Sequence, residues 1–196
     1  MTDNEIINEV LNADKNAFRF LVERYQQLVF RTAIGFLHDS DKAADLTQEV
    51  FIQAYLSLHR FRGDSSFSTW LYRITVNASL NKIRKFSVKK FIRLFEISSD
   101  PDPKSLLTVT DPANPEETMI RNENIEMVRK ALDSLPEKQR IAIVLGKYDG
   151  LSQKEIAEIM NTTEGAVESL LQRAKMNLRK KLSAYETHII QNHKQA

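Results

Sequence analysis

Polar and basic side chains between Glu164 and Arg179 recur at a spacing that suits the reading of duplex DNA. At about 100° per residue, one side of a helix here would carry Gly165, Glu168, Ser169, Gln172, Arg173 and Met176. Glutamine and arginine form hydrogen bonds with base edges in the major groove. From Arg173 to Lys181 there are five basic residues and no acid, a composition that binds backbone phosphates. The segment therefore predicts a DNA-reading helix.

The neighbouring residues predict two short helices that would position this surface. Ser152 and Glu155 have the spacing of a capping box, which begins a helix, and Asn161 with Thr162 would end it. Thr163 is then expected to cap a second helix. Apolar residues in both segments follow a helical spacing: Ile156, Ala157, Ile159 and Met160 in the first, Val167, Leu170, Leu171, Ala174 and Leu178 in the second. A helix-turn-helix is predicted. The alternative is an ordinary helical hairpin whose polar face is merely solvated.

A second group of side chains, between Phe61 and Arg84, has the composition of a surface for single-stranded nucleic acid. Trp70, Arg73, Asn77, Asn81 and Arg84 would fall within one sector of about 80° on a helix that begins near Ser68. Aromatic rings stack on unpaired bases, asparagine bonds to base edges and arginine holds phosphate. The alternative places Phe67, Trp70 and Tyr72 in the core and leaves Arg73 as a solvated charge.

Composition excludes several other classes of protein. The 196 residues are 42% hydrophobic and 28% charged, with five glycines and five prolines, which suits an all-α fold. No cysteine is present, so disulfides, zinc-thiolate sites and a cysteine nucleophile are excluded. The four histidines form no ligand pattern, and we therefore expect neither an enzyme nor a metal or other cofactor. The polar N-terminus and the absence of a long apolar run predict a cytoplasmic protein without membrane contact of its own.

The chain divides into two helical lobes. The net charge is only +2, but residues 82–93 hold six basic residues and no acid, whereas residues 96–123 hold seven acids and two bases. Four of the five prolines lie in the acidic stretch, which predicts a linker. We expect helices over 5–11, 16–37, 42–58 with Asp41 as N-cap, 68–86 and 116–132, and a further helix from Ser134 into the helix-turn-helix. The predicted domains are 1–95 and 116–190, joined by a linker at 96–115.

Four motifs in this order resemble those of a bacterial sigma factor. They are Asp45-Leu46-Thr47-Gln48-Glu49-Val50-Phe51, then Phe61-Arg62-Gly63-Asp64 through Trp70 to Asn77, then Leu135-Pro136-Glu137-Lys138-Gln139-Arg140, and the helix-turn-helix. The chain resembles the extracytoplasmic-function type, with sigma domains two and four only. The resemblance covers roughly residues 17–182 without the linker. Such proteins direct promoter-specific transcription initiation, and their partners are RNA polymerase core, promoter DNA and, by resemblance alone, an anti-sigma factor.

The resemblance assigns three sets of residues. Those for polymerase binding are Asp45, Gln48, Glu49, Ile52 and Gln53; those for the −10 element are Phe61, Arg62, Asp64, Ser65, Trp70, Arg73, Asn77, Asn81 and Arg84; those for the −35 element are Thr163, Glu164, Gly165, Glu168, Ser169, Gln172, Arg173, Lys175 and Arg179. Glu168 and Leu170 stand where many members carry basic residues, so the −35 sequence is expected to be atypical.

Two further hypotheses follow from the same residues. A stand-alone helix-turn-helix regulator is the alternative function, but it would need only the second lobe. Opening roughly ten base steps requires about 14 kcal/mol, whereas each stacked base returns about 1–3 kcal/mol, so the protein needs a larger partner to melt DNA. The acidic linker lies between two basic segments, and we hypothesise that it competes with DNA and keeps the free protein compact. The alternative is an inert spacer.

Overall fold

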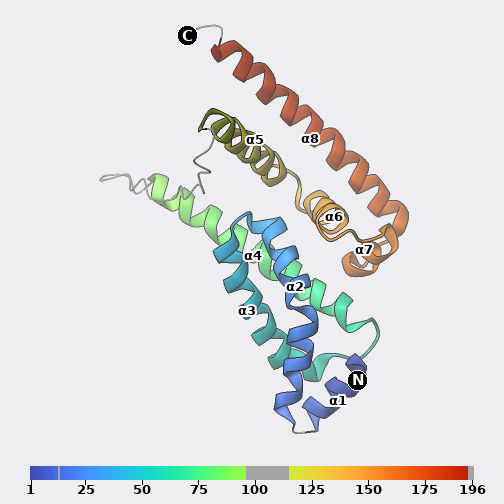
Figure 1. Cartoon of the computed structure of the whole chain (residues 1–196). Coiled ribbons are helices and arrows are strands. Elements are labelled where there is room, and N and C mark those ends of the chain that lie inside the picture. The colour runs from blue at the N-terminus through green and yellow to red at the C-terminus, as the bar shows by residue number, and fades with distance from the viewer. Residues whose placement is uncertain (13, 96–114, 194–196) are drawn as a thin grey trace.

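The computed structural model describes residues 1–12, 14–95 and 115–193, and these fold into α-helices without a strand (Figure 1). The helices are α1 (Asp3–Leu11), α2 (Phe18–Leu37), α3 (Ser40–Ser57), α4 (Phe67–Phe95), α5 (Pro115–Asp133), α6 (Glu137–Lys147), α7 (Gln153–Met160) and α8 (Glu164–His193). Two single turns of 3-10 helix, Lys15–Ala17 and Leu58–Arg60, precede α2 and follow α3. The all-α prediction is confirmed. The predicted linker, 96–115, lies outside the described residues except for Pro115, which begins α5.

Three helix ends differ from the sequence-based expectation. The N-cap of α3 is Asp39, not Asp41: Asp39 has an extended backbone, and its carboxylate accepts the amide of Lys42 at 3.0 Å. Asp41 lies instead in the first turn, where its negative charge interacts favourably with the helix dipole and stabilises α3. At the N-terminus, a capping box of Thr2 and Glu5 starts α1 two residues earlier than expected. Helix α4 continues without a break to Phe95, past the expected end near residue 86.

Lobe one comprises α1 to α4. Helix α2 packs on both α3 and α4, and α1 covers the end of the bundle near the 3-10 turns. The side chains of Leu21, Val29, Leu46, Val50 and Leu71 are fully or almost fully buried in this core. Their helical spacing gives each helix one apolar stripe, and burying these stripes together supplies most of the stability of the lobe.

Lobe two comprises α5 to α8 and contains the predicted helix-turn-helix. The capping box of Ser152 and Glu155 starts α7, and Asn161 ends it in the left-handed conformation, at φ 52°. The hydroxyl of Thr163 accepts the amide of Ala166 at 3.2 Å and so caps α8. Val167, at the start of α8, is fully buried in the core that α6 and α7 share. Local capping therefore positions both helices of the motif.

The two lobes pack directly against each other (Figure 1). Phe36 of α2 and Tyr72, Val76 and Leu80 of α4 share one hydrophobic core with residues of lobe two. The lobe-two members of this core are Ile141, Val144, Leu145, Ile156, Ala157, Ile159 and Val167. We call this contact the seam, and we call the arrangement in which it is formed the closed form.

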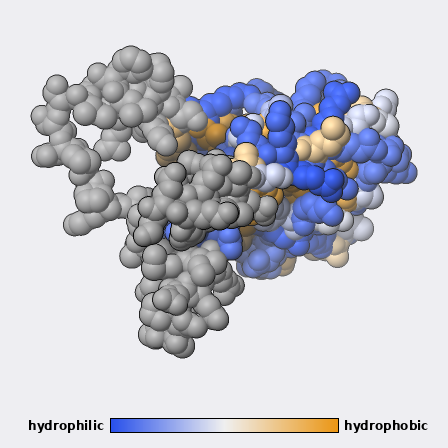
Figure 2. Space-filling view, turned by 90° about the horizontal axis from the view of Figure 1, so that it is seen from above, coloured by the Kyte–Doolittle hydropathy of each residue, from blue (hydrophilic) through white to orange (hydrophobic). Residues whose placement is uncertain are grey.

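The described residues present a largely polar surface on the face seen from above in Figure 2, with small groups of hydrophobic side chains between the hydrophilic ones. Within the described part of the chain, no helix has both the length and the apolar character needed to cross a membrane.

Candidate nucleic-acid interface

Helix α8 presents the residues predicted to read duplex DNA on its solvent-exposed side. All nine are exposed: Thr163, Glu164, Gly165, Glu168, Ser169, Gln172, Arg173, Lys175 and Arg179. The amide of Gln172 donates to the carboxylate of Glu168 at 3.5 Å, across one helical turn. The exposed face therefore offers amide, carboxylate and guanidinium groups from a rigid helix, which is the arrangement that enters a major groove.

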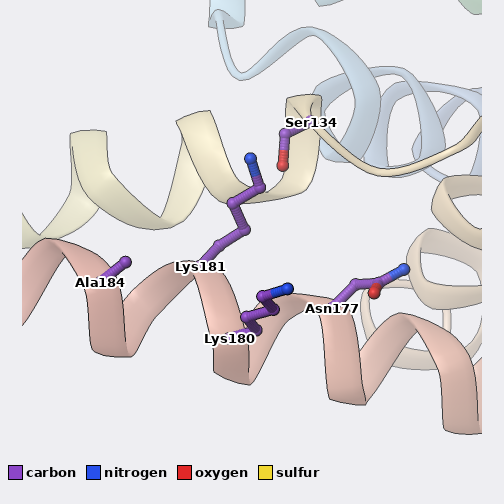
Figure 3. Close-up of a pocket in the computed structure, with 5 residues that line it drawn as sticks. All are labelled: Ser134, Asn177, Lys180, Lys181 and Ala184. Atoms are coloured by element: carbon purple, nitrogen blue, oxygen red, sulfur yellow. The ribbon is translucent and has the colours of Figure 1, made fainter.

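The basic residues that follow on α8 divide into two groups. Lys180 and Lys181 line a groove of about 440 Å³ with Ser134, Asn177 and Ala184. Figure 3 shows the Lys181 side chain extending from α8 toward Ser134, at the end of α5. The Asn177 amide beside them donates to the side chain of Gln139 at 2.8 Å. The Lys181 side chain thus points toward the end of α5 in the same lobe. Arg173, Lys175 and Arg179 instead face solvent.

The aromatic residues near the start of α4 form one cluster. The ring of Phe61 lies 5.8 Å from that of Phe67 and 5.4 Å from that of Trp70. Phe67 and Tyr72 are buried, at 2% and 5% exposure, so the core interpretation holds for both. Phe61 and Trp70 are half-buried, so part of each residue stays accessible. Their packing fixes the rings beside the loop that precedes α4.

The polar residues predicted for the −10 surface have different environments. Arg62, Asp64, Asn77 and Asn81 are exposed, and Ser65 is half-buried. The guanidinium of Arg73 donates to the carbonyl oxygens of Glu158 at 2.6 Å and of Ile159 at 3.2 Å, near the C-terminus of α7.

The last predicted member of this surface, Arg84, bonds to Glu137 of α6 at 2.5 Å. Lobe two therefore occupies two of the three arginines that were predicted to hold the single strand.

One face of α3 is exposed and carries the residues predicted to bind the polymerase: Asp45, Gln48, Glu49, Ile52 and Gln53. Ile52 is 61% exposed, and Leu56, one turn later, is 67% exposed. An exposed apolar pair on one helix face is typical of a partner-binding site. Leu56 is not among the residues predicted from the sequence, although its spacing of four residues from Ile52 is visible there. Glu49 is paired with Lys82 of α4 at 2.7 Å.

A buried polar cluster lies between the lobes. The Asp149 carboxylate has no exposed surface; it accepts a hydrogen bond from Arg31 at 2.9 Å and one from the Thr32 hydroxyl at 2.8 Å. Burial raises the pKa of Asp149, an effect that the bonds from Arg31 and Thr32 reduce. Burial and the nearby Asp149 charge raise the pKa of Tyr72 to about 12. No group of side chains suited to a metal ion is found among the described residues.

Comparison with protein families identifies the chain. Residues 21–87 match the family model of sigma-70 region 2, and residues 125–178 match that of sigma-70 region 4. The chain is also 39% identical over 181 residues to the ECF RNA polymerase sigma-E factor of Escherichia coli K12, covering 89% of this chain and 91% of that protein. The chain belongs to the sigma-70 family. It is an alternative sigma factor of the extracytoplasmic-function type, as its sequence motifs predicted.

One further relative agrees with the family assignment, and two solved structures share the fold. The RNA polymerase sigma-H factor of Pseudomonas aeruginosa is 35% identical over 184 residues, which covers 92% of this chain and 93% of that protein. The fold is similar to that of CnrH in its complex with the cytosolic domain of CnrY, with a TM-score of 0.62, 23% identity and coverage of 93% and 97%. It is also similar to RpoE in complex with the anti-sigma factor NepR from Bartonella quintana, with a TM-score of 0.56, 24% identity and coverage of 85% and 96%.

The two matched regions of the sigma factor contain most of the surfaces described above. The exposed face of α3 and the aromatic cluster lie in region 2, and the exposed face of α8 lies in region 4 up to residue 178. Sigma factors act in transcription initiation and are not classical enzymes. Lys180 and Lys181 lie beyond the region 4 match, in keeping with the different direction of Lys181.

Proposed function

We propose that this sigma factor uses three separate surfaces: the α3 face for RNA polymerase core, the α8 face for the −35 duplex, and the Phe61–Arg84 surface for the −10 single strand. The observation that carries the proposal is the exposed face of α8, where all nine predicted residues reach solvent on one capped helix. The other two surfaces extend the proposal to the remaining steps of initiation.

Reading of the −35 element rests on Gln172 and Arg173. Arginine donates two hydrogen bonds to guanine, and glutamine bonds to adenine in the major groove. Gln172 and Glu168 lie one helical turn apart and 3.5 Å from each other, so the helix sets their order along the groove. Glu168 repels phosphate but accepts a hydrogen bond from the amino group of cytosine. A −35 element with a cytosine opposite Glu168 is the expected consequence.

Capture of the −10 strand rests on Asn77 and on the accessible parts of the half-buried Phe61 and Trp70. Asn77 is exposed on α4, and its amide can bond to the edge of an unstacked base. Stacking on an aromatic ring returns about 1–3 kcal/mol per base, far below the roughly 14 kcal/mol needed to open ten base steps. The captured base therefore stabilises a bubble that the polymerase complex opens, and the sigma factor supplies specificity.

Docking on the polymerase rests on Ile52 and Leu56. Both are largely exposed, and they are surrounded on α3 by polar and acidic residues, as in an interface with an apolar centre and a polar rim. An anti-sigma protein is a further expected partner, because the two structural relatives were solved in complex with the cytosolic domain of CnrY and with NepR.

The proposed function is tested by run-off transcription with core polymerase on a promoter library, with and without the protein. Specific transcripts that require the protein are expected. On a selected promoter, Asn77→Ala should reduce permanganate reactivity of thymines in the −10 region by tenfold or more, because the captured base loses its partner, while polymerase affinity stays unchanged. Asn8→Ala, at an exposed asparagine of α1, is the control. Unchanged thymine reactivity in Asn77→Ala would exclude its role in base capture.

A further inference from the structure

Helix α1 is anchored to α2 by a polar cluster that none of the three proposed surfaces uses. The two carboxylate oxygens of Asp3, in the first turn of α1, accept hydrogen bonds from α2: one from the guanidinium of Arg24, the other from the hydroxyl of Tyr25 at 2.5 Å. Arg24 also donates to the backbone carbonyl of Met1 at 3.0 Å. The match to region 2 begins at residue 21, so α1 lies outside it and its role has to be argued from its contacts.

The ring of Tyr25 connects this polar cluster to the aromatic residues of the −10 surface. It lies 5.4 Å from the ring of Phe67, which is the first residue of α4 and is 2% exposed. Phe67 in turn lies 5.8 Å from the ring of Phe61 and 5.6 Å from that of Trp70. Phe67 is therefore the common support of both half-buried rings, and Tyr25 contacts that support from α2.

A second route leads from α1 to Phe61. Helix α1 contacts the 3-10 turn Leu58–Arg60, which directly precedes Phe61 in the chain. The amide of Phe61 donates to the carbonyl oxygen of Leu58 at 3.0 Å, so the position of the turn sets that of the Phe61 backbone. Ile6 of α1 is fully buried in the same core as Leu58. One helix thus supports the aromatic cluster at two points.

The bond between Asp3 and Tyr25 persists at physiological pH. Burial, together with the hydrogen bond to Asp3 and the Asp3 charge, raises the pKa of Tyr25 to about 12, so the phenol keeps its proton and continues to donate. Rings that are held in place before a base arrives bind it more tightly. Each side chain that has to be ordered on binding lowers affinity about 2- to 13-fold.

We propose that α1 is a positioning element of the −10 surface and that Tyr25 is its positioning residue. The Asp3–Tyr25 bond fixes the Tyr25 ring, and that ring holds Phe67. Phe67 in turn keeps Phe61 and Trp70 in the orientation in which they stack on an unpaired base. Use of the two rings for stacking rests on the proposed function, whereas their dependence on α1 does not.

The first test follows the fluorescence of Trp70, the only tryptophan of the chain. Tyr25→Leu removes the ring that contacts Phe67, whereas Tyr25→Phe keeps the ring and removes only the hydroxyl. Tyr25→Leu should shift the Trp70 emission to longer wavelength and increase its quenching by acrylamide, and Tyr25→Phe should change both by less. Tyr55→Leu is the matched control, because Tyr55 is likewise half-buried in lobe one but its ring contacts Phe18, 5.1 Å away. It should leave the Trp70 signals unchanged.

A second pair of variants tests whether α1 acts through the same bond. Asp3→Ala should change the Trp70 signals as Tyr25→Phe does. The Asp3→Ala, Tyr25→Phe double variant should change them no further, because both substitutions break one hydrogen bond. Glu9→Ala, at an exposed glutamate of α1, is the control and should have no effect.

Strand affinity is measured on the complex with core polymerase, titrated with a labelled single-stranded oligonucleotide that carries the −10 sequence selected by run-off transcription. Release of both Phe61 and Trp70 in Tyr25→Leu should lower this affinity about 4- to 170-fold, the product of two losses of about 2- to 13-fold. Tyr25→Phe should retain most of the affinity. Binding of the variants to core polymerase should stay unchanged, because the α3 face is not altered.

Three results would overturn the proposal. The first is wild-type emission and quenching of Trp70 in both Tyr25→Leu and Asp3→Ala. The second is an equal change in Tyr55→Leu, which would make the effect a general loosening of lobe one. The third is a change in the Trp70 signals without loss of strand affinity, when Asn77→Ala does lower that affinity.

Failure of the proposed function has a different appearance, because Asn77→Ala then leaves strand affinity unchanged as well. In that case the Trp70 signals alone decide whether α1 positions the two rings.

Discussion

Truncation of the apolar pair on α3 should weaken polymerase binding without unfolding the protein. Ile52→Ala and Leu56→Ala each remove three carbon atoms, and each buried methylene contributes about 0.8 kcal/mol. Ile52 and Leu56 are 61% and 67% exposed in the free protein. Docking can therefore bury roughly two-thirds of each residue and recover that share of the burial free energy. The expected loss is about 1.6 kcal/mol per residue and about 3 kcal/mol for the pair, or 100- to 200-fold in Kd.

The assay is titration of the fluorescently labelled protein with core polymerase. Leu11→Ala is the control, since Leu11 is 50% exposed at the end of α1, away from the proposed face. Thermal unfolding should change little for all three variants, because exposed side chains contribute little to stability. Wild-type affinity in the Ile52→Ala, Leu56→Ala double variant would refute the placement of the polymerase interface on this face of α3.

Two further predictions concern the seam and the recognition helix. Burial raises the pKa of Asp149 in the closed form above its ordinary value of 3.8, which it regains in the open form, so protonation favours closure. The closed fraction, measured by the inter-lobe distance, should rise as the pH falls from neutral toward 3.8 and then level off; an equal response in Asp149→Asn would contradict this. Arg173→Ala should cost about 1–3 kcal/mol at one −35 position, whereas Lys180→Ala should weaken all duplexes alike and lower the salt slope by about one. Binding isotherms on matched and mismatched duplexes across salt separate the two, and identical losses would remove Arg173 as a reader.

The helix-turn-helix was predictable because its signals are local. Ser152 with Glu155, and Thr163 with the amide three residues on, act within one helical turn, so a short stretch of sequence determines where α7 and α8 begin. The core of lobe one was likewise predictable from apolar spacing. The N-cap of α3 was not, because Asp39 and Asp41 are equally good caps by residue type, and backbone conformation decides between them.

The seam could not be predicted, because its contacts are far apart in the sequence. Thr32 and Asp149 are 117 residues apart, and Arg73 and Glu158 are 85 apart. Gly35 has no sequence neighbour that explains it, and only the approach of Val144 does. Leu56 is different, since its spacing from Ile52 was visible. Ile52 also lies outside the buried stripe of α3, and Leu56 continues its exposed face one turn later.

The presence of both lobes on one chain makes closure independent of how much protein a cell contains. Segments joined by a short connection meet at an effective concentration in the millimolar range. If isolated lobes associated with a Kd of about 0.1 mM, the joined lobes would be closed about 90% of the time at any dilution. Synthesis of more sigma factor therefore raises the numbers of closed and open molecules in proportion. A change in their ratio requires a change in pH, a substitution within the seam, or a molecule that binds one form more tightly than the other.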